Sequence, residues 1–207
     1  MCSCRLDGSV SDPLLKFHCS ARACDILIDP SMKASLDVKT SIGGIIFDTQ
    51  AGVVINSLSL EATTGGVGAN LVKHVVVAGD VSFVTTTGGV KLSWDNAIVE
   101  NDVQVDAITT TGGVDVDVKQ DEELLGNVSL KAEATTGGVD FAVDIRDDVG
   151  AKIESSVTTG GIDIERRVGF EVTKPLLLSD NYPTGSNFDV SLKTTTGGID
   201  IEATYNP

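Results

Sequence analysis

Apolar and polar residues alternate on both sides of seven Gly-Gly pairs, whose first glycines are residues 43, 65, 88, 112, 137, 160 and 197. Around the pair at 112, the apolar or small residues are Val105, Ala107 and Thr109 before it, and Val114 and Val116 after it. Alternation with a period of two predicts a strand with one side facing a core. Each pair therefore predicts a strand, a corner and a second strand. The inner positions lie seven, five and three residues before the first glycine, and two and four residues after it.

The spacing of these pairs predicts how the strands are stacked. Successive first glycines are 22, 23, 24, 25, 23 and 37 residues apart, and a period in this range is typical of a solenoid. Equivalent residues then form columns about 4.8 Å apart along the axis. Short apolar pairs in AGVVIN, KHVVVAG, DNAIVEN and EELLGN indicate a short third side. We expect an all-β, single-domain parallel β-solenoid (β-helix) of about eight rungs of 21–25 residues, with almost no helix.

The repeated TTGG string has an architectural explanation. Two residues without Cβ atoms allow positive φ angles and a sharp turn on every rung. The preceding threonine pairs can stack and form hydrogen bonds along the corner. We therefore interpret the string as part of the fold rather than as a binding motif.

The repeat is irregular in two places, at the N-terminus and in the long segment before the last Gly-Gly pair. The segment FHCSARACDILI aligns with LKTTTGGIDIEA, so that Phe17 and Cys19 match Leu192 and Thr194. Residues 1–28 are therefore expected to form a cysteine-rich N-terminal cap with a degenerate first rung, and residues 29–207 to form the solenoid. Prolines and a glycine indicate an inserted loop at 165–187 that packs over a flank or closes the C-terminal end.

Composition narrows the choice of partners. The net charge is -15 and the sequence pI is about 4.3, which argues against nucleic acid, because phosphates require clustered Lys and Arg. Cations or cationic surfaces fit better. No apolar stretch approaches the ~20 residues of a membrane span, and MCSCRLDGSV lacks the apolar core of a secretory signal. The chain is expected to be soluble, and export would require a leader that has been removed.

Outward positions on the second strands predict an acidic ladder. Like charges at this spacing repel one another, so the ladder favours a bound cation, and calcium prefers carboxylate ligands. A solvated acidic face without a bound ion is the alternative, and it is favoured because the sequence contains no compact calcium-binding loop. One column comprises Asp115, Asp140, Asp163 and Asp200, and the next comprises Asp117, Glu165 and Glu202. On the first strands, Asp106, Lys131 and Glu154 alternate in sign, which predicts a self-neutralised face.

Four cysteines are expected to gather at the N-terminal end. Cys2, Cys4, Cys19 and Cys24 are compatible with two disulfides, a zinc site or reduced core thiols. The spacing matches a zinc site only loosely, and His18 is expected to point outward. Buried structural cysteines are favoured, oxidised in an extracellular protein and reduced in a cytosolic one.

The sequence contains little that predicts catalysis. His18 and His74 are assigned to different rungs, and no nucleophile motif accompanies them. Most predicted loops are short, whereas β-solenoid enzymes that cleave polysaccharides generally build their sites from long loops. A non-enzymatic protein is expected, with a carbohydrate-active β-helix enzyme as an alternative.

The motif T-T-G-G-[VI]-D-[VIF], preceded by DILIDPSMKASLDVKTSIGGI, resembles the bacterial and archaeal adhesin-like family of β-solenoid domains. The resemblance extends from about Cys24 to Thr204. It implies a cell-envelope or surface role, usually without an assigned ligand or catalytic residues. A cytoplasmic location is expected instead if the chain is a full product without a leader.

We therefore expect a surface or scaffold module that binds a protein or carbohydrate surface through its acidic face or its ends. End-to-end self-association into a filament or envelope subunit is the principal alternative.

Overall fold

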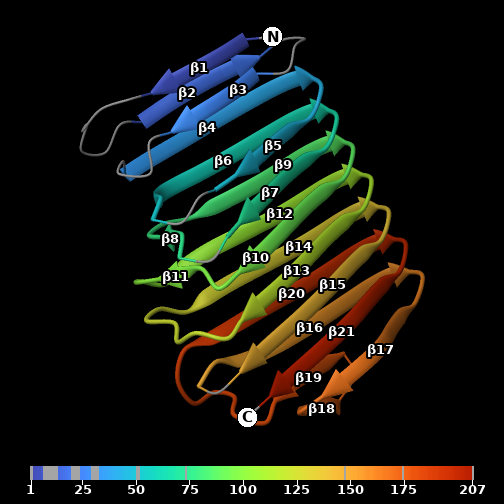
Figure 1. The fold of residues 1–207 in the computed structure, drawn as a ribbon. Coiled ribbons are helices and arrows are strands. Elements are labelled where there is room, and N and C mark those ends of the chain that lie inside the picture. The colour runs from blue at the N-terminus through green and yellow to red at the C-terminus, as the bar shows by residue number, and fades with distance from the viewer. Residues whose placement is uncertain are drawn as a thin grey trace.

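The computed structural model describes residues 2–6, 14–19, 24–28, 33–49, 52–72, 74–146, 148–173 and 175–206, and only the backbone of the first three ranges. Within these ranges every regular element is a β-strand and none is a helix. The strands are stacked in an elongated pile, with the N-terminal strands at one end and the C-terminus toward the other (Figure 1). The expected all-β class is therefore confirmed. No helix capable of crossing a membrane occurs in the described ranges.

Two large sheets make up the pile. In the first sheet, seven strands that precede Gly-Gly corners pair in parallel: β4 (Lys33–Ile42), β6 (Val54–Thr64), β9 (Val81–Thr87), β12 (Val103–Thr111), β14 (Val128–Thr136), β20 (Asn187–Thr196) and β16 (Gly150–Thr159). The second sheet contains the strands that follow the corners, also in parallel: β5 (Ile45–Asp48), β7 (Val67–Leu71), β10 (Val90–Asp95), β13 (Val114–Gln120), β15 (Val139–Arg146), β21 (Ile199–Asn206) and β17 (Ile162–Val168). We call each strand, its corner and its following strand a unit.

The N-terminal strands extend the pile. β2 (Leu14–Cys19) pairs in parallel with β4, placing Phe17 opposite Val38 and Cys19 opposite Thr40. This is the register that the alignment of FHCSARACDILI with the repeat predicts. β1 (Cys2–Leu6) and β3 (Cys24–Ile28) form a separate parallel pair.

Two short strands lie beside the beginning of β6. β8 (Val76–Val77) pairs with residues 54–55, and β11 (Ile98–Val99) pairs with β8. They are formed by the apolar pairs that the sequence assigns to a short third side. They belong to the first sheet, which is mixed because two other strands, described below, run antiparallel.

The core lies between the two sheets, and the predicted inner positions are buried in the middle of the pile. In the unit of β12 and β13, Val105, Ala107, Val114 and Val116 are all 0–1% exposed. The exceptions lie at the ends, where Ile45, Phe47, Val157, Ile162 and Ile164 are only partly buried. The inward register is therefore confirmed. The partly buried positions lie on β5 and β17, the edge strands of the second sheet, and on β16, the last strand of the parallel array in the first.

Aromatic residues link the two sheets through the core. The Trp94 ring meets the Phe188 ring edge to face, with centroids 5.8 Å apart, and Trp94 Nε1 donates a hydrogen bond to Gln120 Oε1 at 2.9 Å. The buried indole N–H is therefore satisfied, which avoids the cost of an unpaired donor.

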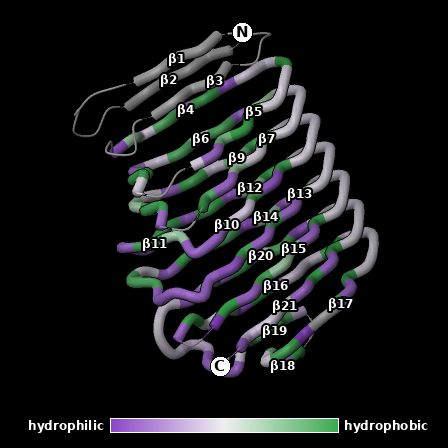
Figure 2. The backbone as a smooth tube through the Cα atoms, in the orientation of Figure 1, coloured by the Kyte–Doolittle hydropathy of each residue, from purple (hydrophilic) through white to green (hydrophobic). Residues whose placement is uncertain are grey.

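The first glycine of each corner is required by the backbone. Gly112 has φ of 142°, and a Cβ atom there would lie 2.0 Å from the Gly88 carbonyl oxygen. The corners also continue the hydrogen-bond ladder, since Gly88 N donates to Thr111 O and Gly112 N donates to Thr136 O. Each corner must therefore repeat the conformation of its neighbour. Threonine and glycine give the corners their pale column of intermediate hydropathy (Figure 2).

Side-chain hydrogen bonds along the corner come from the buried threonine three residues before the first glycine. Thr85, Thr109 and Thr194 each donate through Oγ1 to a glycine carbonyl oxygen of the adjacent unit at 2.8 Å. The two threonines next to the glycines, such as Thr110 and Thr111, are exposed. The side-chain hydrogen bonds therefore come from the buried threonine and not, as the sequence predicts, from the exposed pair.

The order of the units differs from their order in the chain. β20 lies between β14 and β16, and β21 lies between β15 and β17, so the last unit is inserted between the fifth and the sixth. The insertion leaves β16 at the end of the parallel array. There, β19 (Leu176–Ser179) pairs antiparallel with β16, and β18 (Phe170–Thr173) pairs antiparallel with β19. A hairpin contiguous with the sixth unit thus covers the free edge of the first sheet.

The edge strand of the second sheet, β17, is protected in another way. A β-bulge lies between Ile164 and Arg166, and beyond it the exposed residue Arg167 stands opposite Ala203, a buried inward position. Bulges and inward-placed charges discourage a further strand from pairing with an edge.

Candidate functional site

The predicted acidic column exists on the outer face of the second sheet. Backbone register places Asp115 beside Asp140, Asp140 beside Asp200, and Asp200 beside Asp163. The order differs from that in the chain because β21 is inserted before β17. These four side chains are named the acidic column below. Adjacent parallel strands are about 4.8 Å apart, so the like charges follow one another at that spacing.

The acidic column is neutralised at one end and crowded in the middle. Lys91 Nζ lies 2.7 Å from Asp115 Oδ2, and this hydrogen bond raises the pKa of the Lys91 ammonium. Burial, followed by the charges of Asp200 and Asp115, raises the pKa of the Asp140 carboxyl above its ordinary value of 3.8. The centre of the column therefore resists ionisation and favours a nearby positive charge.

The second predicted column is only partly assembled. Asp117 is separated from Glu202 by Ala142, and the backbone register places Arg166, not another acidic residue, opposite Glu202. Glu165 is the additional residue of the β-bulge, which the spacing of the glycines does not reveal. Sequence register therefore placed Glu165 correctly on the strand but not in the column.

A hollow joins parts of both columns. It has a volume of about 250 Å³. Five of the seven residues around it carry carboxylates, and the other two are Phe141 and Ala142. The acidic residues that line it are Asp115, Asp140, Glu165, Asp200 and Glu202.

The arrangement of these carboxylates bears on the calcium hypothesis. In the described part of the chain, no group of three or more His, Cys, Asp or Glu side chains is arranged to hold a metal ion. The acidic column spreads its charges along the pile instead of gathering them around one point. Such a surface attracts positive charge over an extended length.

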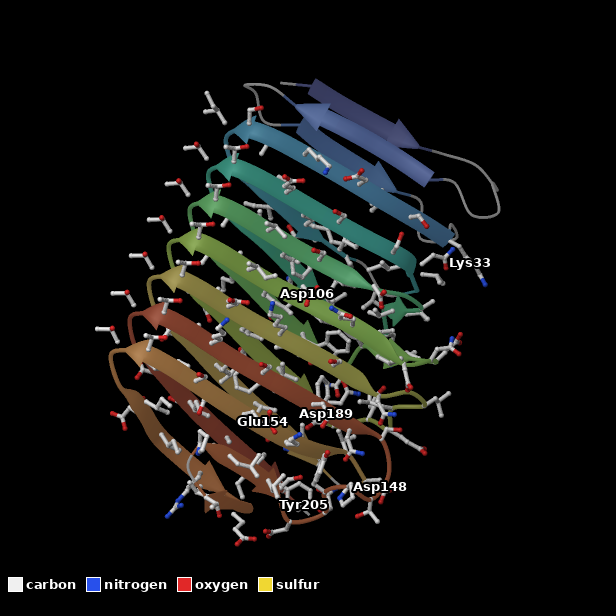
Figure 3. The ribbon with its side chains drawn as sticks, turned by 180° about the vertical axis from the view of Figure 1, so that it is seen from behind. Lys33, Asp106, Asp148, Glu154, Asp189 and Tyr205 are labelled. Carbon is white, nitrogen blue, oxygen red and sulfur yellow. The ribbon has the colours of Figure 1, made fainter. Side chains whose placement is uncertain are left out.

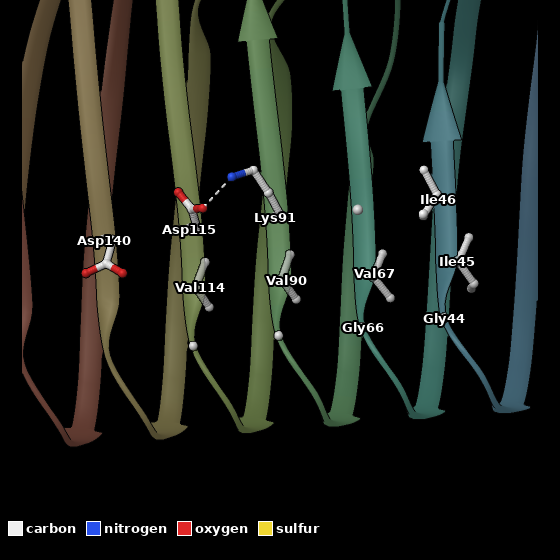
Figure 4. Close-up of a pocket in the computed structure, with 13 residues that line it drawn as sticks. Gly44, Ile45, Ile46, Gly66, Val67, Val90, Lys91, Val114, Asp115 and Asp140 are labelled. Atoms are coloured by element: carbon white, nitrogen blue, oxygen red, sulfur yellow. Dashed lines mark hydrogen bonds and ion pairs between the residues drawn. The ribbon is translucent and has the colours of Figure 1, made fainter.

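A second depression continues from the acidic column along the corner. This groove has a volume of about 520 Å³ and is lined by the second glycines Gly44, Gly66, Gly89 and Gly113, together with the apolar residues that follow them. Ile46 lies at one end, while Lys91, Asp115 and Asp140 lie toward the other (Figure 4). Asp115 and Asp140 line both the groove and the hollow. The two depressions therefore form one continuous surface.

Sequence reasoning missed the groove and Lys91. The signal was present, because the third residue after each first glycine gives Ile46, Gly68 and Lys91 in the units that precede the acidic column. Backbone pairing aligns these three residues with Asp115. The column thus changes from apolar to basic to acidic along the pile.

The outer face of the first sheet has mixed charge. Lys131 and Lys193 lie 2.7 and 3.1 Å from the two carboxylate oxygens of Glu133, and Lys152 lies 2.9 Å from Glu154. Figure 3, which views the molecule from behind, shows Asp106, Glu154 and Asp189 along this sheet. Lys131 stands beside Asp106 in the register, as the alternating column predicts, but Ser191 of the inserted strand β20 separates Lys131 from Glu154.

The cysteines and histidines are placed only in part. Cys2 is the register partner of Cys24, and Cys19 is that of Thr40. The side chains of these strands, including that of His18, lie outside the described part of the structure, as do the predicted burial and pairing of the cysteines. His74 is exposed, and its Nε2 lies 3.8 Å from Glu122 Oε1.

The fold and surface define an all-β protein with one mixed and one parallel sheet facing each other, and with an acidic column on the outer face of the parallel sheet. Comparisons with protein-family models, curated proteins and solved structures find no match for this chain.

Proposed function

We propose that the chain is a non-enzymatic parallel β-solenoid of about eight rungs that serves as a surface or scaffold module. It binds a cationic protein surface through the acidic column and the hollow beside it. The observation that carries this proposal is the register of Asp115, Asp140, Asp200 and Asp163 on one outer face. Complementary potentials of this kind give association its speed and specificity.

The strand register and the repeated motif both favour a solenoid. Equivalent residues of successive units are register partners in both sheets, as with Thr111 and Thr136 in one and Val114 and Val139 in the other. The TTGG motif also resembles that of adhesin-like solenoid domains, which favours a cell-envelope or extracellular setting. The inserted last unit is a departure from winding in simple chain order.

End-to-end assembly is the alternative, and the C-terminal end of the pile argues against it. The β18–β19 hairpin pairs with β16, and β17 has a bulge followed by Arg167 at an inward position. These features are typical of edges that resist further strand pairing. Side-on binding through the acidic face is therefore favoured over polymerisation.

The experiment is a titration with a fluorescent peptide of eight lysines, followed by anisotropy at low and at physiological salt. Combined Asp140→Asn and Asp200→Asn substitutions should raise the Kd about fivefold or more, because two charges at the centre of the column are lost. The matched control combines Glu100→Gln and Glu123→Gln, two exposed residues in the turns before β12 and β14. It removes the same net charge and should change the Kd less than about twofold. An equal rise in Kd for both double variants would mean that binding depends only on the net charge of the protein, which would contradict the proposal.

A further inference from the structure

The groove on the corner has the dimensions of an extended chain. Its lining residues come from β5, β7, β10, β13 and β15, or from the corners that precede them. Five adjacent strands at about 4.8 Å span about 19 Å, and an extended polypeptide covers that distance with about six residues. A chain in the groove would cross these strands and lie along the pile.

The second glycines keep this groove open, although the backbone does not require all of them. The second glycine of each corner is not among those with positive φ. A Cβ atom at Gly113 would lie 3.6 Å from the nearest atom, the Gly138 carbonyl oxygen, and one at Gly161 would have no neighbour within 4 Å. These are ordinary distances, unlike the clash at the first glycine. The fold would therefore tolerate a side chain at Gly113, where one would protrude into the groove.

The two ends of the groove differ in chemistry. At one end, Ile46 is 81% exposed and stands in a part of the groove lined by glycines and apolar residues. At the other end, Asp115 and Asp140 lead into the hollow with its further carboxylates. A ligand that fits both ends must be apolar over one part and cationic over the next.

We infer that the partner is an extended polypeptide segment whose apolar residues lie in the glycine groove and whose basic residues lie over the acidic hollow. A polypeptide supplies apolar and cationic side chains in one linear order, whereas an uncharged glycan lacks the positive charge. The inference rests on the proposed function, since it names the class of partner for the same acidic surface.

The test uses the full chain and three peptides of identical composition. Each peptide has six apolar residues and four lysines. In one block peptide the four lysines form the N-terminal end, in the other they form the C-terminal end, and in the third peptide they are distributed evenly. At least one block peptide should bind about tenfold more tightly than the evenly mixed peptide, because only a block matches the two ends of the groove. Equal Kd values for all three peptides would overturn the inference.

Two leucine variants separate the groove from the acidic surface. Gly113→Leu should raise the Kd of the block peptide about tenfold and leave the Kd of the eight-lysine peptide unchanged. Gly161→Leu is the matched control, since Gly161 does not line the groove, and should affect neither peptide. Melting temperatures of both variants establish that the fold is intact.

The outcomes distinguish the two proposals. If the eight-lysine peptide responds to Asp140→Asn with Asp200→Asn but Gly113→Leu and Gly161→Leu bind the block peptide equally, the groove inference is wrong and the acidic surface stands. If the eight-lysine peptide does not respond to the aspartate variants, the proposed function itself is wrong.

Discussion

The outer faces of the two sheets share one geometry but differ in their electrostatics. On the first sheet, Glu133 lies between Lys131 and Lys193, and hydrogen bonds to both ammonium groups lower the pKa of its carboxyl. On the second sheet, Asp140 lies between Asp115 and Asp200, and burial, followed by the charges of these neighbours, raises the pKa of its carboxyl. The surroundings of the carboxyl therefore stabilise the charged state on the first sheet and disfavour it on the second.

The arrangement of charges on each outer face suggests whether that face serves stability or binding. A face built for stability alone would place opposite charges at neighbouring positions, as the first sheet does at Glu133 and Lys193, because neighbouring strands bring equivalent positions together. The acidic column has no such alternation, so the repulsion between its like charges remains. A positive partner would offset this repulsion, which is why we propose that the second sheet is the binding face.

The largest effect on stability should come from placing a charge on the inner side of the second sheet, compared with a change on its outer side. Phe141 is 2% exposed, whereas its neighbour Asp140 points outward. Phe141→Asp should cost several kcal/mol and unfold the middle of the pile, because it buries an unpaired charge. Asp140→Asn should leave the fold intact. Thermal unfolding followed by circular dichroism measures both, and equal melting temperatures would contradict the assignment of the two sides.

The next largest effect concerns the corner that joins the two faces. Gly112→Ala should cost about 3 kcal/mol, because a Cβ atom would meet the Gly88 carbonyl oxygen at 2.0 Å on a backbone with positive φ. Gly113→Ala should have little effect, or even stabilise slightly, since its Cβ atom meets only ordinary contacts. Chemical denaturation of both variants decides this, and equal destabilisation would mean that both glycines serve the backbone.

Much of this architecture could be predicted from the sequence. The period-two pattern around each Gly-Gly pair identified the strands, the corners and the inward residues, because a buried face imposes the same constraint on every unit. The glycine spacing also aligned the aspartates of the acidic column. The local sequence pattern was sufficient to predict the structure wherever each unit has the same alternation of inward and outward residues around its corner.

The remaining features depend on non-local competition. Nothing in the spacing distinguishes β14–β20–β16 from a stack in chain order, since β16 and β20 carry the same pattern and either could pair with β14. The hairpin that covers β16 is coded by a segment with prolines, which predicts a loop. The bulge at Glu165 shifts the register by one residue, and the groove arises only when four corners lie side by side.

A smaller effect with opposite signs is expected from neutralising one carboxylate on each face. Glu133→Gln should destabilise the protein by about 0.5–1 kcal/mol at neutral pH, because it removes two partly exposed ion pairs. Asp140→Asn should stabilise it by a few tenths of a kcal/mol after solvent screening is considered. Differential scanning calorimetry of the two variants measures the contrast, and shifts of the same sign would contradict it.

The pH dependence of these two variants should also differ in sign. Because the pKa of Glu133 is lowered in the folded state, its contribution is present above its ordinary value of 4.5 and is lost as the pH falls through the lowered pKa. Because the pKa of Asp140 is raised, its contribution is present below 3.8 and is lost as the pH rises through the raised pKa. The melting-temperature differences from wild type should therefore be negative for Glu133→Gln and positive for Asp140→Asn at pH 7. Both should shrink toward pH 3.

The smallest effect is the response of the acidic column to calcium. The calcium hypothesis requires a rise in melting temperature that Asp140→Asn with Asp163→Asn abolishes, since a bound ion stabilises only the native state. A solvated acidic face predicts instead a rise of a few tenths of a degree that magnesium, or sodium at equal ionic strength, reproduces through screening. We expect the second result, because the acidic column distributes its charges along the pile, and within the described ranges no three His, Cys, Asp or Glu side chains are arranged to hold a metal ion. A calcium-specific rise of several degrees, lost in the double variant, would overturn this expectation and make the column an ion site. In that case a bound calcium ion, rather than a cationic partner, would neutralise the acidic column on the second sheet.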